Sequence, residues 1–374
     1  MEQNKFFPEI HGRLGFGCMR LPMQGEEVDL DLFARMVDRF LEQGFNYFDT
    51  AHGYIRGKSE TAIRACLTSR YPRERYLLTD KLTGTYFKTE ADIRPLFQQQ
   101  LEACGVEYFD FYLMHSQHRE NFEHFRSCRA YETAFELKAE GKIRHVGISF
   151  HDSPEMLEKI LDTYPEIEVV QIQFNYLDYE NPNVQSRAVY EVLERYGKPV
   201  LIMEPVKGGT LVELPARSQA VLDALGGGSN ASYAVRFAAG FPQVCTVLSG
   251  MSDLAQIEDN TTTMKDFRPL DEREQAAVAR VRELYLEEKS IPCTNCRYCV
   301  EGCPRQILIP DLFHAMNMKR VFRSWDQEER YAELTAQNGK ASACIRCGRC
   351  ERVCPQHLPI RELLVEIAKT FERE

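Results

Sequence analysis

Short apolar runs alternate with amphipathic stretches along the first 285 residues of the chain. Apolar runs of four to eight residues, bounded by polar or turn-forming residues, are typical of buried strands. Strands are predicted at residues 14–19, 46–51, 76–82, 110–115, 143–149, 169–175, 199–204 and 245–250. Apolar residues at helical spacing predict helices around 30–42, 59–68, 89–103, 121–140, 154–163, 184–196, 229–239, 253–264 and 271–285.

This alternation predicts the fold class. Eight β–α units within about 250 residues match a (β/α)8 (TIM) barrel. An open, doubly wound sheet is the alternative, but it usually has fewer strands, and no G-x-G-x-x-G motif follows the first predicted strand. We therefore predict an α/β fold in which residues 1–285 form a (β/α)8 barrel.

Eight of the 13 cysteines lie in two runs near the C-terminus, and both runs read C-x2-C-x2-C-x3-C-P. The first run holds Cys293, Cys296, Cys299 and Cys303; the second holds Cys344, Cys347, Cys350 and Cys354. This spacing is typical of [4Fe–4S] ligation, and in two-cluster ferredoxins the fourth cysteine of each run binds the other cluster. Two crossed sets are therefore expected: Cys293, Cys296, Cys299 with Cys354, and Cys344, Cys347, Cys350 with Cys303. Zinc is the alternative, but zinc ribbons usually pair two separated C-x2-C knuckles.

These runs define a second region. We predict that residues 286–374 form a small C-terminal, helical, ferredoxin-like domain with two 4Fe–4S clusters. The insert between the runs is predicted to be helical over 311–322 and 326–339. The five scattered cysteines are expected to be small buried apolar side chains: Cys18, Cys66, Cys104, Cys128 and Cys245.

Composition limits the classes of partner. The net charge of −10, without a long basic block, argues against nucleic acid. No apolar run approaches 18 residues, so no membrane span is expected. The N-terminal MEQNKFFPEIHG lacks the basic and apolar segments of a secretory signal, so a cytoplasmic location is expected. Thirteen cysteines in such a reducing compartment point to metal or redox chemistry before disulfides.

Polar residues stand where three predicted strands end, which in a barrel is the catalytic face. Asp49 ends the second strand, Lys81 the third and His115 the fourth, while Tyr54 follows the second strand by a few residues. A tyrosine can give a proton to a carbonyl oxygen, and a nearby ammonium stabilises the phenolate and lowers its pKa. Lys81 could supply the ammonium and Asp49 could hold it, while His115 could orient the substrate oxygen.

These residues belong to motifs by which the chain resembles the aldo–keto reductases over roughly residues 12–265. The motifs are LGFGCMRLP, FNYFDTAHGY, TDKL, FDFYLMHS, GKIRHVGIS, VVQIQFNYL and LSGMSDLAQIEDN. The resemblance implies that Asp49, Tyr54, Lys81 and His115 form the catalytic tetrad, with Tyr54 as the general acid. It also implies NAD(P)H-dependent reduction of a small carbonyl compound, with the cofactor extended across the barrel mouth.

The resemblance also assigns cofactor contacts. Ser149 and Gln171 match the positions that hold the nicotinamide carboxamide, and Asp259 and Asn260 match contacts to the adenosine end. Phe150 replaces an Asn common beside that serine, and Met203 replaces an aromatic that usually stacks on nicotinamide. Gly250 and Gln256 replace a basic pair that usually grips the 2′-phosphate of NADPH, and a clamp without Lys or Arg is weak. The choice between NADH and NADPH therefore stays open.

The ferredoxin-like tail, together with ISFHD and EPVKGG, resembles a branch of the family with a C-terminal 4Fe–4S domain. His151 and the stretch 204–207 are expected at the rim of the pocket, and Gly208 with Gly209 is weak evidence for a phosphate-binding loop.

A hydride carries two electrons and a cluster passes one, so coupling the two needs a mediator such as a flavin. Three arrangements stay open: structural or regulatory clusters, a flavin in the barrel, or a redox partner protein. The leading hypothesis is an oxidoreductase that reduces an aldehyde or ketone, with sugar-like carbonyls one class. The alternatives are a flavin- or partner-coupled electron-transfer protein and a non-catalytic redox sensor.

Overall fold

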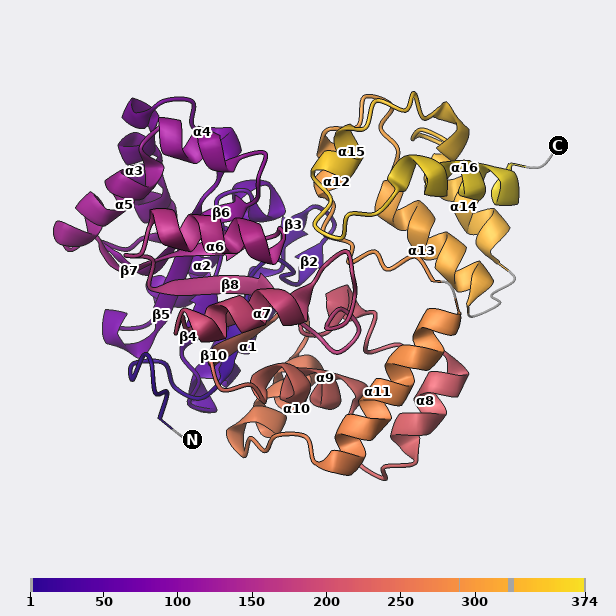
Figure 1. Cartoon of the computed structure of the whole chain (residues 1–374), viewed down its shortest axis with the longest axis horizontal. Helices are drawn as coiled ribbons and strands as arrows, with labels where there is room; N and C mark the ends of the chain where they lie inside the picture. The colour runs from indigo at the N-terminus through magenta and orange to yellow at the C-terminus, as the bar shows by residue number, and fades with distance from the viewer. Residues whose placement is uncertain (1–2, 289, 322–325, 373–374) are drawn as a thin grey trace. The chain divides into compact units, whose positions relative to one another are not determined.

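Eight parallel strands close into a barrel, the core of the first of two compact units (Figure 1). The computed structural model describes residues 3–288, 290–321 and 326–372. The order around the barrel is β1-β10-β9-β8-β7-β6-β5-β4. The strands are β1 (Leu14–Gly17), β4 (Tyr47–Asp49), β5 (Leu77–Leu82), β6 (Phe109–Gln117), β7 (Ile143–Phe150), β8 (Val169–Gln173), β9 (Val200–Met203) and β10 (Val244–Ser249). Every predicted strand is confirmed, and the closed ring excludes the open doubly wound sheet.

The predicted helices are present with two irregularities. They are α1 (Leu30–Glu42), α2 (Lys58–Ile63), α3 (Glu90–Cys104), α6 (Pro154–Thr163), α7 (Ser186–Arg195), α9 (Asn230–Ala239), α10 (Leu254–Lys265) and α11 (Glu272–Glu287). The single helix predicted over 121–140 is wrong, because Arg129 adopts φ 52° and separates α4 (Phe122–Ser127) from α5 (Ala130–Ala139). The last turn of the helix predicted over 59–68 is a wider π-helix at Arg64–Thr68.

Elements that were not predicted within the first 285 residues include α8 (Ala216–Asp223) and a hairpin of β2 (Met23–Gln24) and β3 (Glu27–Val28). In the described parts of the chain, no helix is both long enough and apolar enough to cross a membrane.

Aromatic residues fill the interior between the barrel and α1. The side chain of Asp29 caps α1 by accepting from the backbone N–H of Leu32 at 2.9 Å. Phe40 of α1 then packs edge-on against Phe16 of β1 and Phe48 of β4. All five scattered cysteines are buried, as expected.

The second unit comprises residues 182–184, 206–230 and 271 onward. It therefore contains the helices α8 and α11 as well as the cysteine-rich region. Its further helices are α12 (Tyr298–Glu301), α13 (Ile309–Arg320), α14 (Gln327–Thr335), α15 (Arg349–Arg352) and α16 (Ile360–Phe371). The two helices predicted in the insert are thus present as α13 and α14, although Phe322, at the end of the first prediction, lies outside the described residues.

The cysteine-rich region is an internal repeat with an offset of 51 residues, the distance from Cys293 to Cys344. Helices α12 and α13 repeat as α15 and α16 at this offset. Left-handed backbone positions repeat as well: Asn295, Arg297 and Gln306 correspond to Arg346, Gly348 and His357. The backbone N–H of Asn295 donates to Cys293 Sγ at 3.5 Å, and that of Arg346 donates to Cys344 Sγ at 3.4 Å. The two runs therefore fold alike, as their spacing implies.

Candidate active site and iron–sulfur sites

Lys81 lies at the centre of the candidate active site, in the first unit. Its Nζ donates to Asp49 Oδ1 at 2.6 Å, to the carbonyl oxygen of Thr50 at 2.7 Å and to Tyr54 Oη at 3.3 Å. Asp49 is the last residue of β4, Lys81 lies near the end of β5, and Tyr54 begins a short 3-10 helix (Tyr54–Gly57). The structure therefore brings an ammonium, its counter-charge and a phenol together at the carboxyl ends of neighbouring strands.

The carboxylate of Asp49 is held at both oxygens. Gln171 of β8 donates from Nε2 to Asp49 Oδ2 at 2.9 Å, and both Asp49 and Lys81 are buried. Burial raises the pKa of the Asp49 carboxyl, while the Lys81 ammonium and the Gln171 amide act against that rise. A buried ion pair with its remaining lone pairs satisfied is held in one geometry.

His115 faces the same phenol from β6. Its ring is edge-on to that of Tyr54, with centroids 5.9 Å apart, and its Nδ1 lies 2.7 Å from Thr83 Oγ1. Burial lowers the pKa of His115 well below its ordinary value, and the charges of Lys81 and His151 add to the effect. The imidazole is therefore neutral near pH 7 and presents Nε2 as its other polar atom.

The pKa of Tyr54 departs from the expectation that Lys81 would lower it. Burial raises the pKa of the phenol well above its ordinary value, and the Asp49 carboxylate raises it further. Burial is the largest cause of this rise, and it outweighs the opposing charge of Arg20. The phenol therefore keeps its proton at neutral pH, which is the state that a general acid requires.

The residues that the resemblance assigns to the cofactor differ from one another in burial and in hydrogen bonding. Ser149 is buried opposite Gln171 in the register of β7 and β8, and Met203 ends β9 half-buried. The Gln256 side chain is bound locally at the start of α10, to the Ser252 N–H and to Asp253 Oδ2.

The remaining assigned residues lie at β10 and α10. Asn260 is buried and donates from Nδ2 to Ser249 Oγ at 3.0 Å. Asp259 precedes it on α10, and Gly250 directly follows β10. Gln171, Gln256 and Asn260 thus all have protein partners.

Two residues near the site were not predicted. Thr83 binds His115, and no sequence signal marks it. Arg20 lies against Gly250, since a Cβ at that glycine would be 3.6 Å from Arg20 Cβ. Its charge also lowers the pKa of Tyr54 against the effect of burial. Arg20 stands within LGFGCMRLP, so a search for basic residues in the first strand's loop would have found it.

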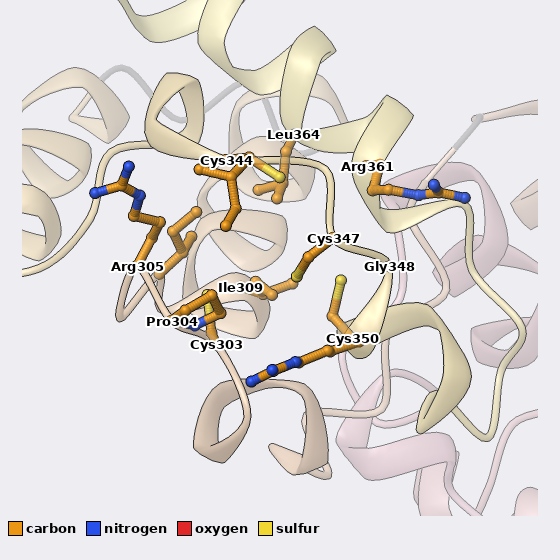
Figure 2. Close-up of a pocket in the computed structure, with 13 residues that line it drawn as sticks. Cys303, Pro304, Arg305, Ile309, Cys344, Cys347, Gly348, Cys350, Arg361 and Leu364 are labelled. Atoms are coloured by element: carbon orange, nitrogen blue, oxygen red, sulfur yellow. The ribbon is translucent and has the colours of Figure 1, made fainter.

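One candidate iron–sulfur site is a pocket of the second unit. Cys303 of the first run lines it together with Cys344, Cys347 and Cys350 of the second run. Figure 2 shows these four side chains around a single space. The empty volume is about 340 Å³, and apolar side chains such as Ile309 and Leu364 form part of the wall. Four sulfur donors around one space fit a cubane cluster.

The other four cysteines are also brought together. Burial raises the pKa of the Cys299 thiol, and the charges of Cys296, Cys293, Cys354 and Cys350 raise it further. Cysteines of both runs thus lie near Cys299. Thiolates crowded in this way repel one another, and bound iron would remove the repulsion. Helices α12 and α15, which carry Cys299 and Cys350, lie side by side (Figure 1).

The stretch expected at the rim of the barrel pocket, residues 204–207, includes a buried lysine. Lys207 is fully buried in the second unit, and its Nζ donates to Gln356 Oε1 at 2.7 Å. Gly208 follows at φ 64°, and a Cβ there would be 2.2 Å from the carbonyl oxygen of Thr294. Gly208 therefore allows close packing on the first cysteine run. The next glycine, Gly209, has φ 99° and open space around it. His151, also expected at the rim, is half-buried.

Family models match both regions. The aldo/keto reductase family model matches residues 13–283, and a 4Fe-4S dicluster domain model matches residues 292–359. An NADH-specific methylglyoxal reductase from Escherichia coli is 27% identical over 224 residues, covering 53% of this chain and 65% of that protein. An aldo-keto reductase from Mycolicibacterium smegmatis is 27% identical over 203 residues, covering 54% and 67%. The matches thus span about two thirds of these relatives.

Solved structures share the barrel. An aldo-keto reductase from Bacillus halodurans in its holo form has a TM-score of 0.62 and 24% identity, covering 75% of this chain and 95% of that one. One from Klebsiella pneumoniae in complex with NADPH has a TM-score of 0.59 and 18% identity, covering 73% and 90%. The fold, the motifs at the strand ends and the two matching models lead to one conclusion. The chain belongs to the aldo/keto reductase family and carries a C-terminal 4Fe-4S dicluster domain.

Proposed function

We propose that the chain reduces an aldehyde or ketone with NAD(P)H, with Tyr54 as the proton donor. The observation that carries this proposal is the position of Lys81 Nζ, 2.6 Å from Asp49 Oδ1 and 3.3 Å from Tyr54 Oη. A bound nicotinamide would supply the hydride. The NADH-specific relative and the NADPH-bound neighbour support this cofactor class, and NADH versus NADPH is decided by experiment.

The residues of the site would act on the carbonyl oxygen. Tyr54 Oη gives its proton to that oxygen as the carbonyl carbon is reduced, and the phenolate that forms is stabilised by the Lys81 ammonium. Asp49 and Gln171 hold that ammonium in position. Where Thr83 donates to Nδ1 of His115, the neutral ring carries its proton on Nε2 and donates a hydrogen bond to the same carbonyl oxygen, which orients it.

Replacing Tyr54 with phenylalanine tests this role, because only the hydroxyl is lost. A positioned general acid contributes about 10²- to 10⁴-fold in rate, so kcat/KM for aldehydes and ketones should fall by that factor. Iron content and nicotinamide binding should be unchanged. A Tyr54→Phe enzyme with the wild-type kcat/KM would refute the proposal.

We propose in addition that the eight clustered cysteines hold two 4Fe–4S clusters in the two crossed sets. Bound clusters would supply one-electron transfer. The pocket lined by Cys303, Cys344, Cys347 and Cys350 supports one set. It leaves Cys293, Cys296, Cys299 and Cys354 for the other, and Cys354 is among the thiols whose charges act on Cys299. The free, buried cysteines and the acidic composition support a reducing, cytoplasmic location.

A flavin- or partner-coupled electron-transfer protein is the second candidate. Met203 in place of an aromatic and the locally bound Gln256 favour it, because the first departs from the usual nicotinamide contact and the second from the usual 2′-phosphate clamp. Anaerobic spectra of the purified protein discriminate between the candidates. Cluster absorption bleached by NADH, with flavin released on denaturation, would support coupling. Clusters inert to NADH and to substrate would leave carbonyl reduction as the sole proposed activity.

A further inference from the structure

The second cysteine run is more open to solvent than the first at Cys347, because its counterpart Cys296 is half-buried. Cys347 is exposed, whereas the other seven cysteines of the two runs are buried or partly buried. Cys347 also lines the pocket with Cys303, Cys344 and Cys350. A cluster in this pocket would therefore have one edge at the protein surface. Such an edge is where an external molecule could exchange an electron with it.

Three arginines stand beside Cys347. Arg346, Arg349 and Arg352 are exposed, and no carboxylate in the described parts of the chain forms an ion pair with any of them. The nearby Glu351 is already bound to Arg361, with Nη2 and Oε2 2.6 Å apart. Arg349 and Arg352 are three residues apart on α15, a spacing that puts both side chains on one side of a helical turn. The positive charge is therefore available to an external partner.

Two large apolar side chains flank the same segment. Ile345 is 53% exposed and Val353 is 47% exposed. Apolar side chains beside exposed arginines are typical of protein interfaces, in which arginine is enriched over lysine. We call these six residues, Ile345, Arg346, Cys347, Arg349, Arg352 and Val353, the Cys347 face.

The internal repeat provides a control for this face. At the offset of 51, Ile345 corresponds to Thr294, which is buried, and Arg346 corresponds to Asn295. Arg349 and Arg352 correspond to Tyr298 and Glu301, so the first run has no cation at these positions. The backbone is the same in both runs. Cluster binding alone therefore does not require the three arginines or the exposed apolar pair.

We propose that the Cys347 face is the docking site of a small protein electron carrier with an acidic surface. This inference rests on the proposed cluster at Cys303, Cys344, Cys347 and Cys350. One electron passes between carrier and cluster, so one is oxidised as the other is reduced, and no bond or proton changes. The net charge of −10 on the whole chain repels an acidic carrier elsewhere and orients it toward this cationic face.

The same net charge argues against two other polyanions. Nucleic acids and anionic membranes are bound through many phosphate contacts, and three arginines on an acidic chain provide few. A small acidic carrier needs only a local patch and an apolar centre, and the face offers both.

The test is anaerobic stopped-flow mixing of the oxidised holoprotein with a reduced acidic flavodoxin as the probe. In the variant Arg346→Gln/Arg349→Gln/Arg352→Gln, the second-order rate constant at low salt should fall tenfold or more, and its salt dependence should flatten. The matched control is Arg35→Gln/Arg75→Gln/Arg268→Gln, which removes the same charge from exposed positions of the first unit. The control should change the rate less than twofold.

The following results would overturn either the docking site or the proposed function. An unchanged rate in the first variant with intact clusters would overturn the docking site and leave the proposed function standing. A wild-type protein whose clusters are reduced by dithionite but by no carrier would instead refute the electron-transfer part of the proposed function. If the triple variant loses iron, Arg349→Gln alone should still slow transfer about threefold per intact cluster, and no slowing would overturn the proposal.

Further measurements distinguish an acidic protein carrier from a basic one, a membrane or a nucleic acid. A basic cytochrome c, mixed with the reduced holoprotein, should be insensitive to the triple substitution. Sedimentation with phosphatidylglycerol vesicles, or a shift with duplex DNA, should be absent. Arginine-dependent binding to either, with the flavodoxin rate unchanged, would overturn the proposal in favour of a membrane or nucleic acid.

Discussion

The barrel site and the iron–sulfur sites are assembled in different ways. The barrel site takes one or two side chains from each of several strands, and Asp49 and Gln171 meet although 122 residues separate them. The cysteine sites come from two short runs whose backbones repeat each other. The first kind of site depends on the whole fold, and the second is largely local. The two should therefore respond differently to substitution.

The largest expected effect is the loss of a whole cluster when one cysteine is replaced. Two [4Fe–4S] clusters hold about eight iron ions per chain, so Cys303→Ala and Cys347→Ala should each leave about half. The same cluster signal should vanish from the electron paramagnetic resonance spectrum in both variants, since the two cysteines line one pocket.

The control for this experiment is Cys245→Ala, which removes a buried barrel cysteine and should keep all the iron. If Cys303→Ala abolished the same signal as Cys296→Ala, the ligands would not be crossed, and each run would bind its own cluster.

The next effect concerns the buried ion pair of the barrel. Lys81→Met leaves the Asp49 carboxylate buried without its ammonium, which should lower the free energy of unfolding by about 3–5 kcal/mol. Adding Asp49→Asn removes the orphaned charge and should restore most of that stability without restoring carbonyl reduction. Denaturant unfolding of the single and double variants measures the difference. Equal stability of Lys81→Met and wild type would contradict a buried ion pair.

A smaller effect is expected where the loop after β9 packs on the first cysteine run. Gly208 and Gly209 both have positive φ, so alanine at either position should cost about 1–2 kcal/mol in backbone strain. Gly208→Ala must in addition displace the carbonyl oxygen of Thr294 and should cost more. Thermal unfolding and iron content of the two variants test this. A Gly209→Ala variant that loses more iron than Gly208→Ala would contradict this packing.

The smallest effect is the response of carbonyl reduction to pH. The pKa of Tyr54 is raised and that of His115 is lowered, so neither group changes its proton between about pH 7 and 9. The rate should stay flat in this window and fall only at higher pH, as Tyr54 loses its proton. The kcat/KM profile, measured at saturating cofactor, shows whether this holds. A fall centred near pH 7.5 would contradict the neutral phenol.

His115 also affects stability at acid pH. Its pKa in the folded protein is lower than in the unfolded chain, so below the unfolded pKa, near 6.5, the unfolded state binds more protons. Stability should therefore fall as the pH falls through that value.

Much of this could be predicted from the sequence, for physical reasons. The eight strands were marked by short apolar runs, and Asp49, Lys81 and His115 were marked by the points where such runs stop. The iron–sulfur sites could be predicted because the spacing of their cysteines along the chain can be read without knowing the fold.

Features that depend on three-dimensional contacts were missed. Nothing in the sequence indicates that Thr83 meets His115, or that Lys207 lies buried with its Nζ bound to Gln356. The raised pKa of Tyr54 was missed because the sequence does not reveal how deeply the phenol is buried.

The central claim is that Lys81 acts on the carbonyl through Tyr54. A double-mutant cycle of Tyr54→Phe and Lys81→Met, read as kcat/KM for aldehyde reduction by the holoprotein, tests it most directly. When two residues act as one unit, the rate losses caused by replacing each of them are strongly non-additive. The double variant should therefore be no slower than the slower single variant. If the two losses multiplied instead, Lys81 and Tyr54 would act independently, which would contradict a proton donor supported by the Lys81 ammonium.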